Sequence, residues 1–342
     1  MRALSINTHG QPLAAVDIAV PAPAADEVVI RVRAAGICHT DANLRRGGSS
    51  SATLPLIPGH EIAGDITALG SSVRDRTVGE RVCVHYVVSC TQCLHCRAGR
   101  EQFCLTGQMI GAQRPGGYAE FVAVPARNAV LLPDGISYVH GAVMMCSSAT
   151  SLHALHRARI AAGDTVAVLG VGGLGISAVQ LARELGAARV FAVDRDAEKL
   201  KVAESFGATS VNAGADDAVA RVRELTDGLG VTIALDLVGA PAITLQALQM
   251  LAVHGRAVAV GIHPKAMELP VYRTILSPEV ELVGANDHLL SELHELLGMA
   301  QRGALDLGPV DVRTLPLDAD AVNTVLDALD AYQAPFRSAI VL

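Results

Sequence analysis

Several features that mark other classes of protein are scarce or missing in this chain of 342 residues. Tryptophan is absent, aromatic residues make up 3%, and charged residues make up 18%, which is too few for a disordered chain. No Lys/Arg-rich run is present and the formal net charge is −7, so we expect no nucleic-acid partner. Hydrophobic residues make up 51%, which indicates a folded protein with ample material for a core.

The N-terminal stretch MRALSINTHGQPLAAVDIAV lacks the continuous apolar segment of a secretory signal. We therefore expect a cytoplasmic protein with reduced thiols, and seven cysteines are an odd number for a disulfide framework. The longest uncharged stretch, residues 165–182, approaches the lower length limit of a membrane span. It holds four glycines between two differently patterned halves, so a strand, a turn and a helix explain it better, and no membrane partner is expected.

Four of the cysteines lie together in CTQCLHCRAGREQFC, at Cys90, Cys93, Cys96 and Cys104. A short irregular segment with the spacing C-x2-C-x2-C-x7-C can wrap around one ion, and structural zinc favours four sulfurs in a closed tetrahedron. Two disulfides are disfavoured by the expected reducing compartment, and an iron–sulfur cluster remains an alternative in another sequence context. A nucleic-acid zinc ribbon would separate two CxxC pairs by about 15–20 residues, and this spacing is absent from the sequence. We predict a structural zinc site in 90–104.

Three further residues form a second candidate metal site: Cys38 in AAGICHTD, His60 in PGHEIAG and Cys146 in VMMCSSAT. Two thiolates and one imidazole are the ligand set of a catalytic zinc whose fourth position is open. An ion held in this way polarises a bound oxygen and lowers its pKa. Taken alone, Cys146 is more readily a core cysteine, so this hypothesis depends on the surrounding motifs.

A glycine turn typical of dinucleotide binding follows the apolar run 166–169, with G-x-G-x-x-G at Gly170, Gly172 and Gly175. Glycine permits the tight turn and the close approach of a pyrophosphate, and the next helix points its N–H groups at the phosphates. The strand ARVFAVD then ends in Asp194, 19 residues after Gly175 and near the expected distance of about 20. A carboxylate there binds ribose hydroxyls and repels a 2′-phosphate, which favours NAD over NADP, although Arg195 weakens that preference.

GICHTD, PGHEIAG, the four-cysteine segment, GGYAEFVAVPARNAVLLPDGIS and VLGVGGLGISAVQLARELGA occur in this order. The sequence closely resembles the zinc-dependent medium-chain alcohol dehydrogenases over essentially its whole length. Zinc-free relatives such as quinone reductases lack the two zinc motifs. The resemblance implies an oxidoreductase that moves a hydride reversibly between a primary or secondary alcohol and NAD, with two zinc ions per subunit.

The resemblance also implies a role for individual residues. Cys38, His60 and Cys146 match the catalytic zinc ligands, and Thr40 matches the hydroxyl that takes the proton of a zinc-bound alcohol, which then reacts as an alkoxide. Asp41 matches the carboxylate that orients the ligand imidazole, and Glu61 matches a carboxylate behind the zinc. Thr40 and His85 are expected in the substrate pocket. The expected cofactor-binding residues are His39, Gly170, Gly172, Gly173, Leu174, Gly175, Asp194, Arg195 and Lys199.

The sequence departs from the family at three places. Asn43 stands where many members have the histidine that ends the proton relay, so we expect the proton to leave through water. Ser338 and Ala339 stand where a Gly-Arg pair commonly supports the pyrophosphate; either cofactor affinity is lower or Arg337 reaches it by another path. Ethanol-preferring relatives narrow the pocket with tryptophans, whose absence suggests bulkier alcohols here. Cys83 fits neither metal set, and we interpret it as a buried structural thiol.

A single core rarely grows beyond about 250–300 residues, and the chain is predicted to have two domains in an α/β fold. We expect a GroES-like, β-rich catalytic domain over 1–146, a Rossmann coenzyme domain with a doubly wound parallel sheet over 147–282, and a return to the catalytic domain over 283–342. The stretch 45–55 is the most loop-like and is expected to border the substrate entrance.

Three matters stay open from the sequence. A homo-oligomer is expected, and a tetramer is favoured over a dimer. A polyol or diol dehydrogenase on the same scaffold is an alternative, although those relatives often replace the third ligand by glutamate. A zinc- and nucleotide-binding protein without catalytic activity is the alternative from another class.

Overall fold

The computed structural model describes residues 1–48, 52–262 and 265–342, which form two compact units. Unit 1 comprises Met1–Cys146, Leu289–Gln301 and Val310–Leu342, and unit 2 comprises Ser147–His288 and Arg302–Pro309. Within these described ranges, no helix is both long enough and apolar enough to cross a membrane.

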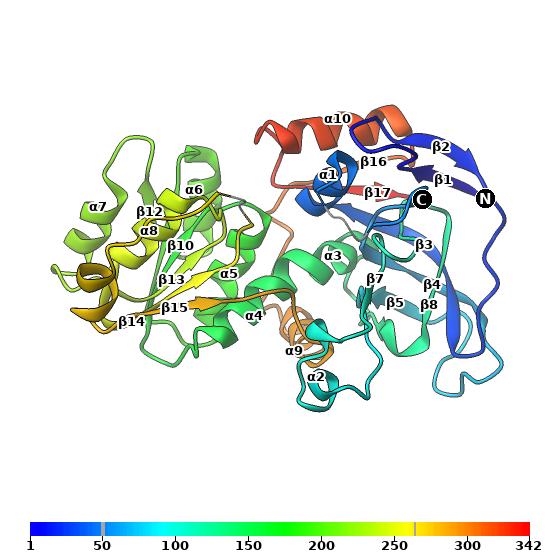
Figure 1. The fold of residues 1–342 in the computed structure, drawn as a ribbon, viewed down its shortest axis with the longest axis horizontal. Coiled ribbons are helices and arrows are strands. Elements are labelled where there is room, and N and C mark those ends of the chain that lie inside the picture. The colour runs from blue at the N-terminus through cyan, green and yellow to red at the C-terminus, as the bar shows by residue number, and fades with distance from the viewer. Residues whose placement is uncertain (49–51, 263–264) are drawn as a thin grey trace. The chain divides into compact units, whose positions relative to one another are not determined.

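Unit 1 is built on a seven-stranded sheet with the order β16-β17-β3-β4-β5-β9, in which β8 also pairs with β3 (Figure 1). The pairs are antiparallel except for β16 with β17, which are parallel. The strands of unit 1, which include the separate pairs β1-β2 and β6-β7, are β1 (Arg2–Ser5), β2 (Ala14–Asp17), β3 (Glu27–Ile37), β4 (Glu61–Leu69), β5 (Arg81–Val84), β6 (Val87–Val88), β7 (Gln108–Met109), β8 (Phe121–Pro125), β9 (Ala129–Leu131), β16 (Val312–Leu315) and β17 (Arg337–Val341). Its helices are α1 (His39–Arg46), α2 (Leu94–Arg97), η1 (Glu101–Phe103), η2 (Ala126–Asn128), α3 (Tyr138–Val143), α9 (Leu290–Gln301) and α10 (Ala319–Asp330).

The strand β3 is the centre of this sheet because it pairs with β4, β8 and β17. Its sequence EVVIRVRAAGI is rich in β-branched residues, which fit a pleated surface, and most of it is buried. The C-terminal end of β3 leads directly into α1, so this end of the sheet fixes where α1 begins.

Unit 2 contains a six-stranded parallel sheet with the order β12-β11-β10-β13-β14-β15 (Figure 1). This is the order of a doubly wound dinucleotide-binding sheet. The strands are β10 (Thr165–Leu169), β11 (Arg189–Asp194), β12 (Thr209–Asn212), β13 (Val231–Asp236), β14 (Leu251–Ala259) and β15 (Glu281–Gly284). The helices are α4 (Ala149–Arg157), α5 (Gly173–Glu184), α6 (Ala197–Ser205), α7 (Ala218–Leu225), α8 (Pro241–Gln249) and the π-helical turn η4 (Tyr272–Leu276). A second π-helical turn, η3 (Met144–Ser148), joins α3 to α4.

The sequences of the parallel strands are largely continuous apolar runs, because helices pack on the sheet and remove its side chains from water. In β10 the segment VAVL is fully buried, and in β13 the segment IALD is too. Asp196 and Asp217 accept hydrogen bonds from the first backbone N–H groups of α6 and α7, which fixes where these helices begin. The predicted combination of a β-rich body with a doubly wound parallel sheet is confirmed.

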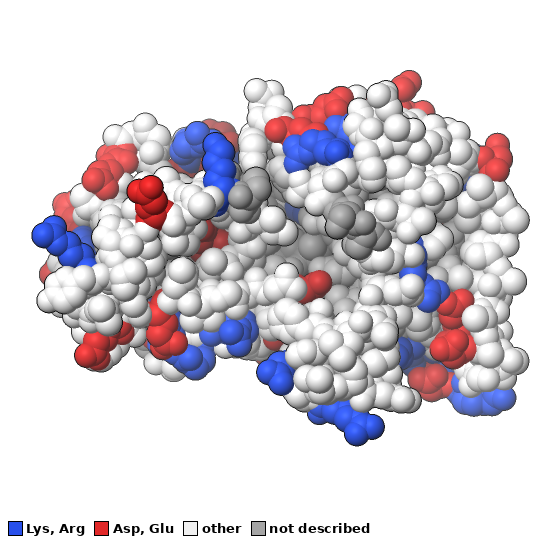
Figure 2. Space-filling view, in the orientation of Figure 1, with Lys and Arg blue, Asp and Glu red and all other residues white. Residues whose placement is uncertain are grey.

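Two other features bear on the sequence expectations. The first two residues of the predicted loop 45–55 instead complete α1, and residues 49–51 of that loop lie outside the described residues. On the face drawn in Figure 2, the described Lys and Arg side chains are scattered among Asp and Glu rather than gathered into one basic area.

Candidate active site

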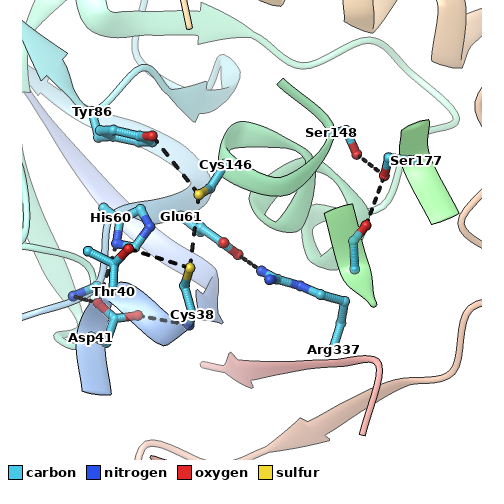
Figure 3. Close-up of polar contacts among 12 residues, drawn as sticks. Cys38, Thr40, Asp41, His60, Glu61, Tyr86, Cys146, Ser148, Ser177 and Arg337 are labelled. Atoms are coloured by element: carbon cyan, nitrogen blue, oxygen red, sulfur yellow. Dashed lines mark hydrogen bonds and ion pairs between the residues drawn. The ribbon is translucent and has the colours of Figure 1, made fainter. Parts of the chain in front are cut away.

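Three predicted ligands that are distant in the sequence come together in unit 1. Cys38 is the N-cap of α1, directly after β3; His60 directly precedes β4; and Cys146 lies in η3. The α-helical pattern is locally widened in η3, and such π-helical turns occur frequently at functional sites. Figure 3 shows the three side chains pointing toward one another.

The geometry of this cluster fits a zinc ion. The Sγ atoms of Cys38 and Cys146 are 4.0 Å apart, and one ligand atom from each of Cys38, His60, Glu61 and Cys146 lies within 4.8 Å of the others. His60 is completely buried, yet its Nε2 has no hydrogen-bond partner among the residues that the structure describes. A buried imidazole nitrogen without a partner is costly unless it binds something. Two thiols and one imidazole with an unpartnered nitrogen are the donor set of a catalytic zinc site.

Asp41 holds this cluster in place from beneath. Its carboxylate accepts hydrogen bonds from the backbone N–H of Cys38 at 2.9 Å, the backbone N–H of Gly59 at 3.2 Å and the hydroxyl of Tyr118 at 3.0 Å. The same carboxylate lies 3.3 Å from Nδ1 of His60 (Figure 3). A carboxylate in this position fixes the imidazole tautomer and leaves Nε2 for a metal.

The buried charges perturb the acidity of all three ligands. The hydrogen bond from Cys146 lowers the pKa of Cys38 well below its usual value, although burial acts in the opposite direction. The pKa of Cys146 is raised by the same hydrogen bond and by burial. Burial is the largest influence and opposes a proton on His60, but the charge and hydrogen bond of Asp41, together with those of Cys38, outweigh it and raise the pKa of His60. A metal ion would replace these protons, since it binds thiolate and neutral imidazole.

Glu61 forms a buried ion pair with Arg337, which reaches the cluster from β17 (Figure 3). Burial raises the pKa of Glu61 to about 7, although the guanidinium group opposes this rise. The carboxylate occupies the space where Gly36 has no side chain, since a Cβ there would lie 1.8 Å from Oε2 of Glu61. The sequence left two alternatives for the C-terminal segment, a lower cofactor affinity or a pyrophosphate contact from Arg337. The structure places Arg337 behind the metal ligands, where it pairs with Glu61. Ser338, the next residue, is buried within β17.

The predicted pocket residues Thr40 and His85 differ in their surroundings. Thr40 is partly exposed and its Oγ1 lies 3.8 Å from Sγ of Cys38. His85 is buried, and its backbone oxygen accepts a hydrogen bond from Asn128. The next residue, Tyr86, faces the cluster: its ring packs edge-on against His60 with centroids 4.9 Å apart, and its hydroxyl lies 4.0 Å from Sγ of Cys146.

The four-cysteine segment forms the second metal cluster. One sulfur from each of Cys90, Cys93, Cys96 and Cys104 lies within 4.8 Å of the others, and the backbone N–H groups of Cys90 and Cys93 point at sulfurs of the cluster. Backbone hydrogen bonds lower the pKa of Cys90 to about 6, which favours the thiolate that zinc binds. All seven cysteines are free thiols. This closed set of four sulfurs fits a structural zinc ion.

Cys83 belongs to neither cluster. It is completely buried on β5, and burial raises its pKa to about 12. It therefore has the environment of an inert core thiol.

The glycine turn in unit 2 fits a dinucleotide. Gly170 has a φ of +92°, and a Cβ at Gly175 would lie 2.2 Å from the carbonyl oxygen of Gly170. Gly172 is the N-cap of α5 without a side-chain cap, and a Cβ there would meet no described atom within 4 Å. The helix therefore begins with backbone N–H groups that no N-cap side chain satisfies, next to a glycine that leaves space beside it, and this suits a pyrophosphate.

The other predicted cofactor residues of unit 2 follow this turn in the chain, whereas His39 is the first residue of α1 in unit 1. Gly173 and Leu174 open α5, and Asp194 at the end of β11 accepts a hydrogen bond of 2.7 Å from the backbone N–H of Val171. Arg195 is exposed and Lys199 is half-buried in the first turn of α6.

Comparison with known proteins agrees with this geometry. Residues 24–134 match the family model described as alcohol dehydrogenase GroES-like domain, and residues 173–300 match that described as zinc-binding dehydrogenase. An alcohol dehydrogenase of Geobacillus stearothermophilus is 33% identical over 96% of each chain, and an NAD-dependent alcohol dehydrogenase of Sulfurisphaera tokodaii is 30% identical over the whole of both chains. The chain belongs to the zinc-containing medium-chain alcohol dehydrogenase family.

The similarity extends to the three-dimensional structure. The crystal structure of the alcohol dehydrogenase from Aeropyrum pernix has a TM-score of 0.91 and 34% identity, with complete coverage of both chains. The resemblance and the GroES-like fold predicted from the sequence are thus confirmed. As a member of the zinc-containing medium-chain alcohol dehydrogenases, the chain is an oxidoreductase that acts on CH–OH groups with NAD, and it carries two zinc sites.

Two residues of the site, Tyr86 and Tyr118, escaped the sequence reasoning, and so did the ion pair of Arg337 with Glu61. Tyr86 was within reach, since it is one of only five tyrosines and adjoins the predicted pocket position. Tyr118 and Arg337 were not, because their partners Asp41 and Glu61 are 77 and 276 positions away in the chain. Contacts of that separation depend on strand pairing that the sequence pattern does not specify.

Proposed function

We propose that the protein catalyses the reversible oxidation of primary or secondary alcohols to aldehydes or ketones, with Cys38, His60 and Cys146 as ligands of the catalytic zinc. One observation carries this proposal: the three side chains meet in a buried cluster whose imidazole is already oriented by Asp41. When bound, zinc supplies the Lewis acid that polarises the substrate oxygen, and the nicotinamide of NAD supplies the hydride acceptor.

The protein positions the alcohol and removes its proton. Thr40 is the partly exposed hydroxyl beside the ligand Cys38, so its Oγ1 is suited to accept the hydrogen bond of the substrate hydroxyl and to pass the proton outward. Asn43, one helical turn later, has no group that titrates near neutral pH, and its side-chain oxygen accepts a hydrogen bond from Arg46. The proton therefore leaves through solvent rather than through a side chain at this position.

Coenzyme binding is assigned to the turn of unit 2, so unit 2 is proposed as the coenzyme domain and unit 1 as the catalytic domain. The domain boundary predicted at residue 282 lies within β15, which pairs with β14 in unit 2. The open N-terminus of α5 suits the pyrophosphate, and Asp194 suits the adenosine ribose. The Asp194 carboxylate would repel a 2′-phosphate, which supports NAD as the preferred coenzyme. His39, Arg195 and Lys199 complete the proposed set of coenzyme residues.

The substrate is proposed to be larger than ethanol. The chain has no tryptophan to narrow the pocket, and Tyr86 is the aromatic side chain that packs against His60. A pocket that is not narrowed by tryptophan suits bulky primary, benzylic or secondary alcohols. The subunits are proposed to assemble into a homo-oligomer, with a tetramer favoured over a dimer.

A substrate panel tests this proposal. We expect NADH formation with secondary and benzylic alcohols at a higher kcat/KM than with ethanol, and at a higher kcat/KM for NAD than for NADP. Thr40→Ala should lower kcat about 100-fold or more, because general acid–base groups contribute roughly 10²–10⁴-fold. Thr40→Ser keeps the hydroxyl and should retain most of the rate. Equal turnover by Thr40→Ala and the parent protein would exclude Thr40 from the proton path, and no turnover of any alcohol would refute the proposed reaction.

A further inference from the structure

Tyr332 adopts a backbone conformation that tyrosine normally avoids. It lies just after the C-terminus of α10 with a φ of +56°, in the left-handed region that glycine favours at this position. The backbone N–H of Tyr332 bonds to the carbonyl of Leu329 and that of Gln333 to the carbonyl of Ala328, which is the pattern of a glycine-type helix end. A bulky side chain is strained here, and Tyr332 recovers little of that cost by burial, since it is 76% exposed.

The ring of Tyr332 contacts His39, the first residue of α1. The two ring centroids are 5.3 Å apart and the planes are tilted by 38°, a separation typical of aromatic pairs. His39 lies between Cys38 and Thr40 and is only partly buried. The strained tyrosine is therefore in contact with the residue that separates a metal ligand from the proposed proton acceptor.

The contact is not needed to hold the two helices together. Helices α1 and α10 pack side by side (Figure 1), and Arg45 at the end of α1 forms ion pairs with Asp327 at 2.7 Å and Asp330 at 2.9 Å. Arg46 forms a further ion pair with Asp330 at 2.7 Å. These pairs already fix α10 against α1, so a glycine after α10 would close the helix at lower conformational cost. What a glycine could not supply is a ring against His39.

We infer that Tyr332 is a positioning residue for coenzyme binding: its ring holds the His39 imidazole in the orientation that donates a hydrogen bond to a pyrophosphate oxygen. The inference rests on the proposed coenzyme role of His39 and extends it to a residue from the other end of the chain. A half-exposed imidazole without a neighbour samples several rotamers, and binding must then fix one of them. The ring of Tyr332 removes that freedom before the coenzyme arrives.

The experiment compares Tyr332→Gly, Tyr332→Phe and His39→Ala in steady-state kinetics and thermal unfolding. We expect Tyr332→Gly to raise KM for NAD about two- to tenfold, the range of one aromatic contact. Its kcat at saturating NAD should stay within about twofold of the parent, since the contact acts on binding rather than on the reacting atoms. Its melting temperature should be unchanged or higher, because glycine relieves the strained backbone. Tyr332→Phe keeps the ring and should match the parent in KM.

Two comparisons separate positioning from a purely structural role. Asp227→Gly is the matched control, since exposed Asp227 follows α7 with a φ of +54°; it should relieve similar strain and leave KM unchanged. In a double-mutant cycle, Tyr332→Gly should add nothing to the KM of His39→Ala, because both changes remove one interaction. An unchanged KM in Tyr332→Gly, or effects that multiply in the cycle, would overturn the inference. An unchanged KM in His39→Ala would instead refute the coenzyme role of His39, while turnover of alcohols by the parent tests the reaction separately.

Discussion

At the scale of single residues, the site depends on side chains that bind neither metal nor substrate. The carboxylate of Asp41 is completely buried and accepts three hydrogen bonds while it faces Nδ1 of His60. Such a group costs free energy to bury, and its partners compensate for this cost only when all of them are present. The orientation of the ligand imidazole is thus set before a metal binds.

Asp41→Ala should therefore weaken zinc binding at the catalytic site. Loss of a carboxylate that orients a histidine ligand typically lowers metal affinity about 10–100-fold. Competition with a fluorescent chelator measures the dissociation constant of the more weakly bound zinc. Asp75→Ala is the control, since Asp75 is an exposed surface residue that pairs with the adjacent Arg76. Equal zinc affinity in Asp41→Ala and the control would show that Asp41 does not support the metal site.

Cys83 leads to a prediction about alkaline pH. Burial raises its pKa from 9.0 to about 12, so between these values the unfolded chain loses a proton that the folded chain keeps. The free energy of unfolding must therefore fall as the pH rises through this window, by about 1.4 kcal/mol per pH unit for one group. Serine does not titrate there, so Cys83→Ser should lack this contribution. Denaturant unfolding at pH 8.5, 9.5 and 10.5 measures the free energy of unfolding of the parent and of Cys83→Ser. The difference between the two proteins should become smaller as the pH rises, and a constant difference would contradict the raised pKa of Cys83.

Individual residues also show how far the sequence can predict a site. The family resemblance carried by the surrounding motifs was sufficient to single out Cys38, His60 and Cys146, and the structure brings them together. It was not sufficient for Gly36, whose missing side chain makes room for Glu61 across the pairing of β3 with β4. Nor was it sufficient for Tyr332, because the role inferred for this residue depends on its φ value and on its ring contact with His39, near the other end of the chain.

At the scale of elements, the four-cysteine lobe (residues 90–104) is the clearest case of structure held by a metal site. Its short helices α2 and η1 contain no buried residue, so the lobe has little apolar packing of its own. Glu101 connects it to the rest of unit 1 by accepting a hydrogen bond of 2.8 Å from the backbone N–H of Leu290 at the start of α9. The strands of unit 2 could be read from their apolar runs, whereas α2 and η1 could not, because the cysteine cluster rather than periodicity determines their shape.

Cys93→Ser should remove zinc from this lobe and destabilise the protein. Structural zinc sites contribute directly to folding free energy, so we expect a lower melting temperature and one zinc ion fewer per chain. The initial rate of alcohol oxidation at low temperature should remain near that of the parent, since the other cluster is intact. Cys83→Ser retains all seven zinc-site residues and is therefore the control for zinc content. Unchanged zinc content and melting temperature in Cys93→Ser would refute a structural zinc site.

At the scale of the whole molecule, the chain builds two kinds of sheet for two tasks. In unit 1, residues that follow β3, begin β4 or lie in η3 and β17 meet in one buried cluster, and in unit 2 a glycine turn follows the strand β10 of the parallel sheet. The parallel sheet was predictable because buried parallel strands and the glycine turn have strong local patterns. For unit 1 the family resemblance predicted a β-rich domain but no strand order, since its pairings join β3 to β17 across the length of the chain.

The central claim is that the buried cluster around His60 binds the zinc that catalysis requires. The most direct test measures zinc content and alcohol-dependent NADH formation together in the parent and in His60→Ala, with circular dichroism to verify folding. We predict about two zinc ions per chain in the parent, one in folded His60→Ala, and activity lowered at least about 1,000-fold, since the ligand set of a catalytic zinc is then incomplete. A folded His60→Ala protein that keeps two zinc ions, or most of its activity, would contradict this account.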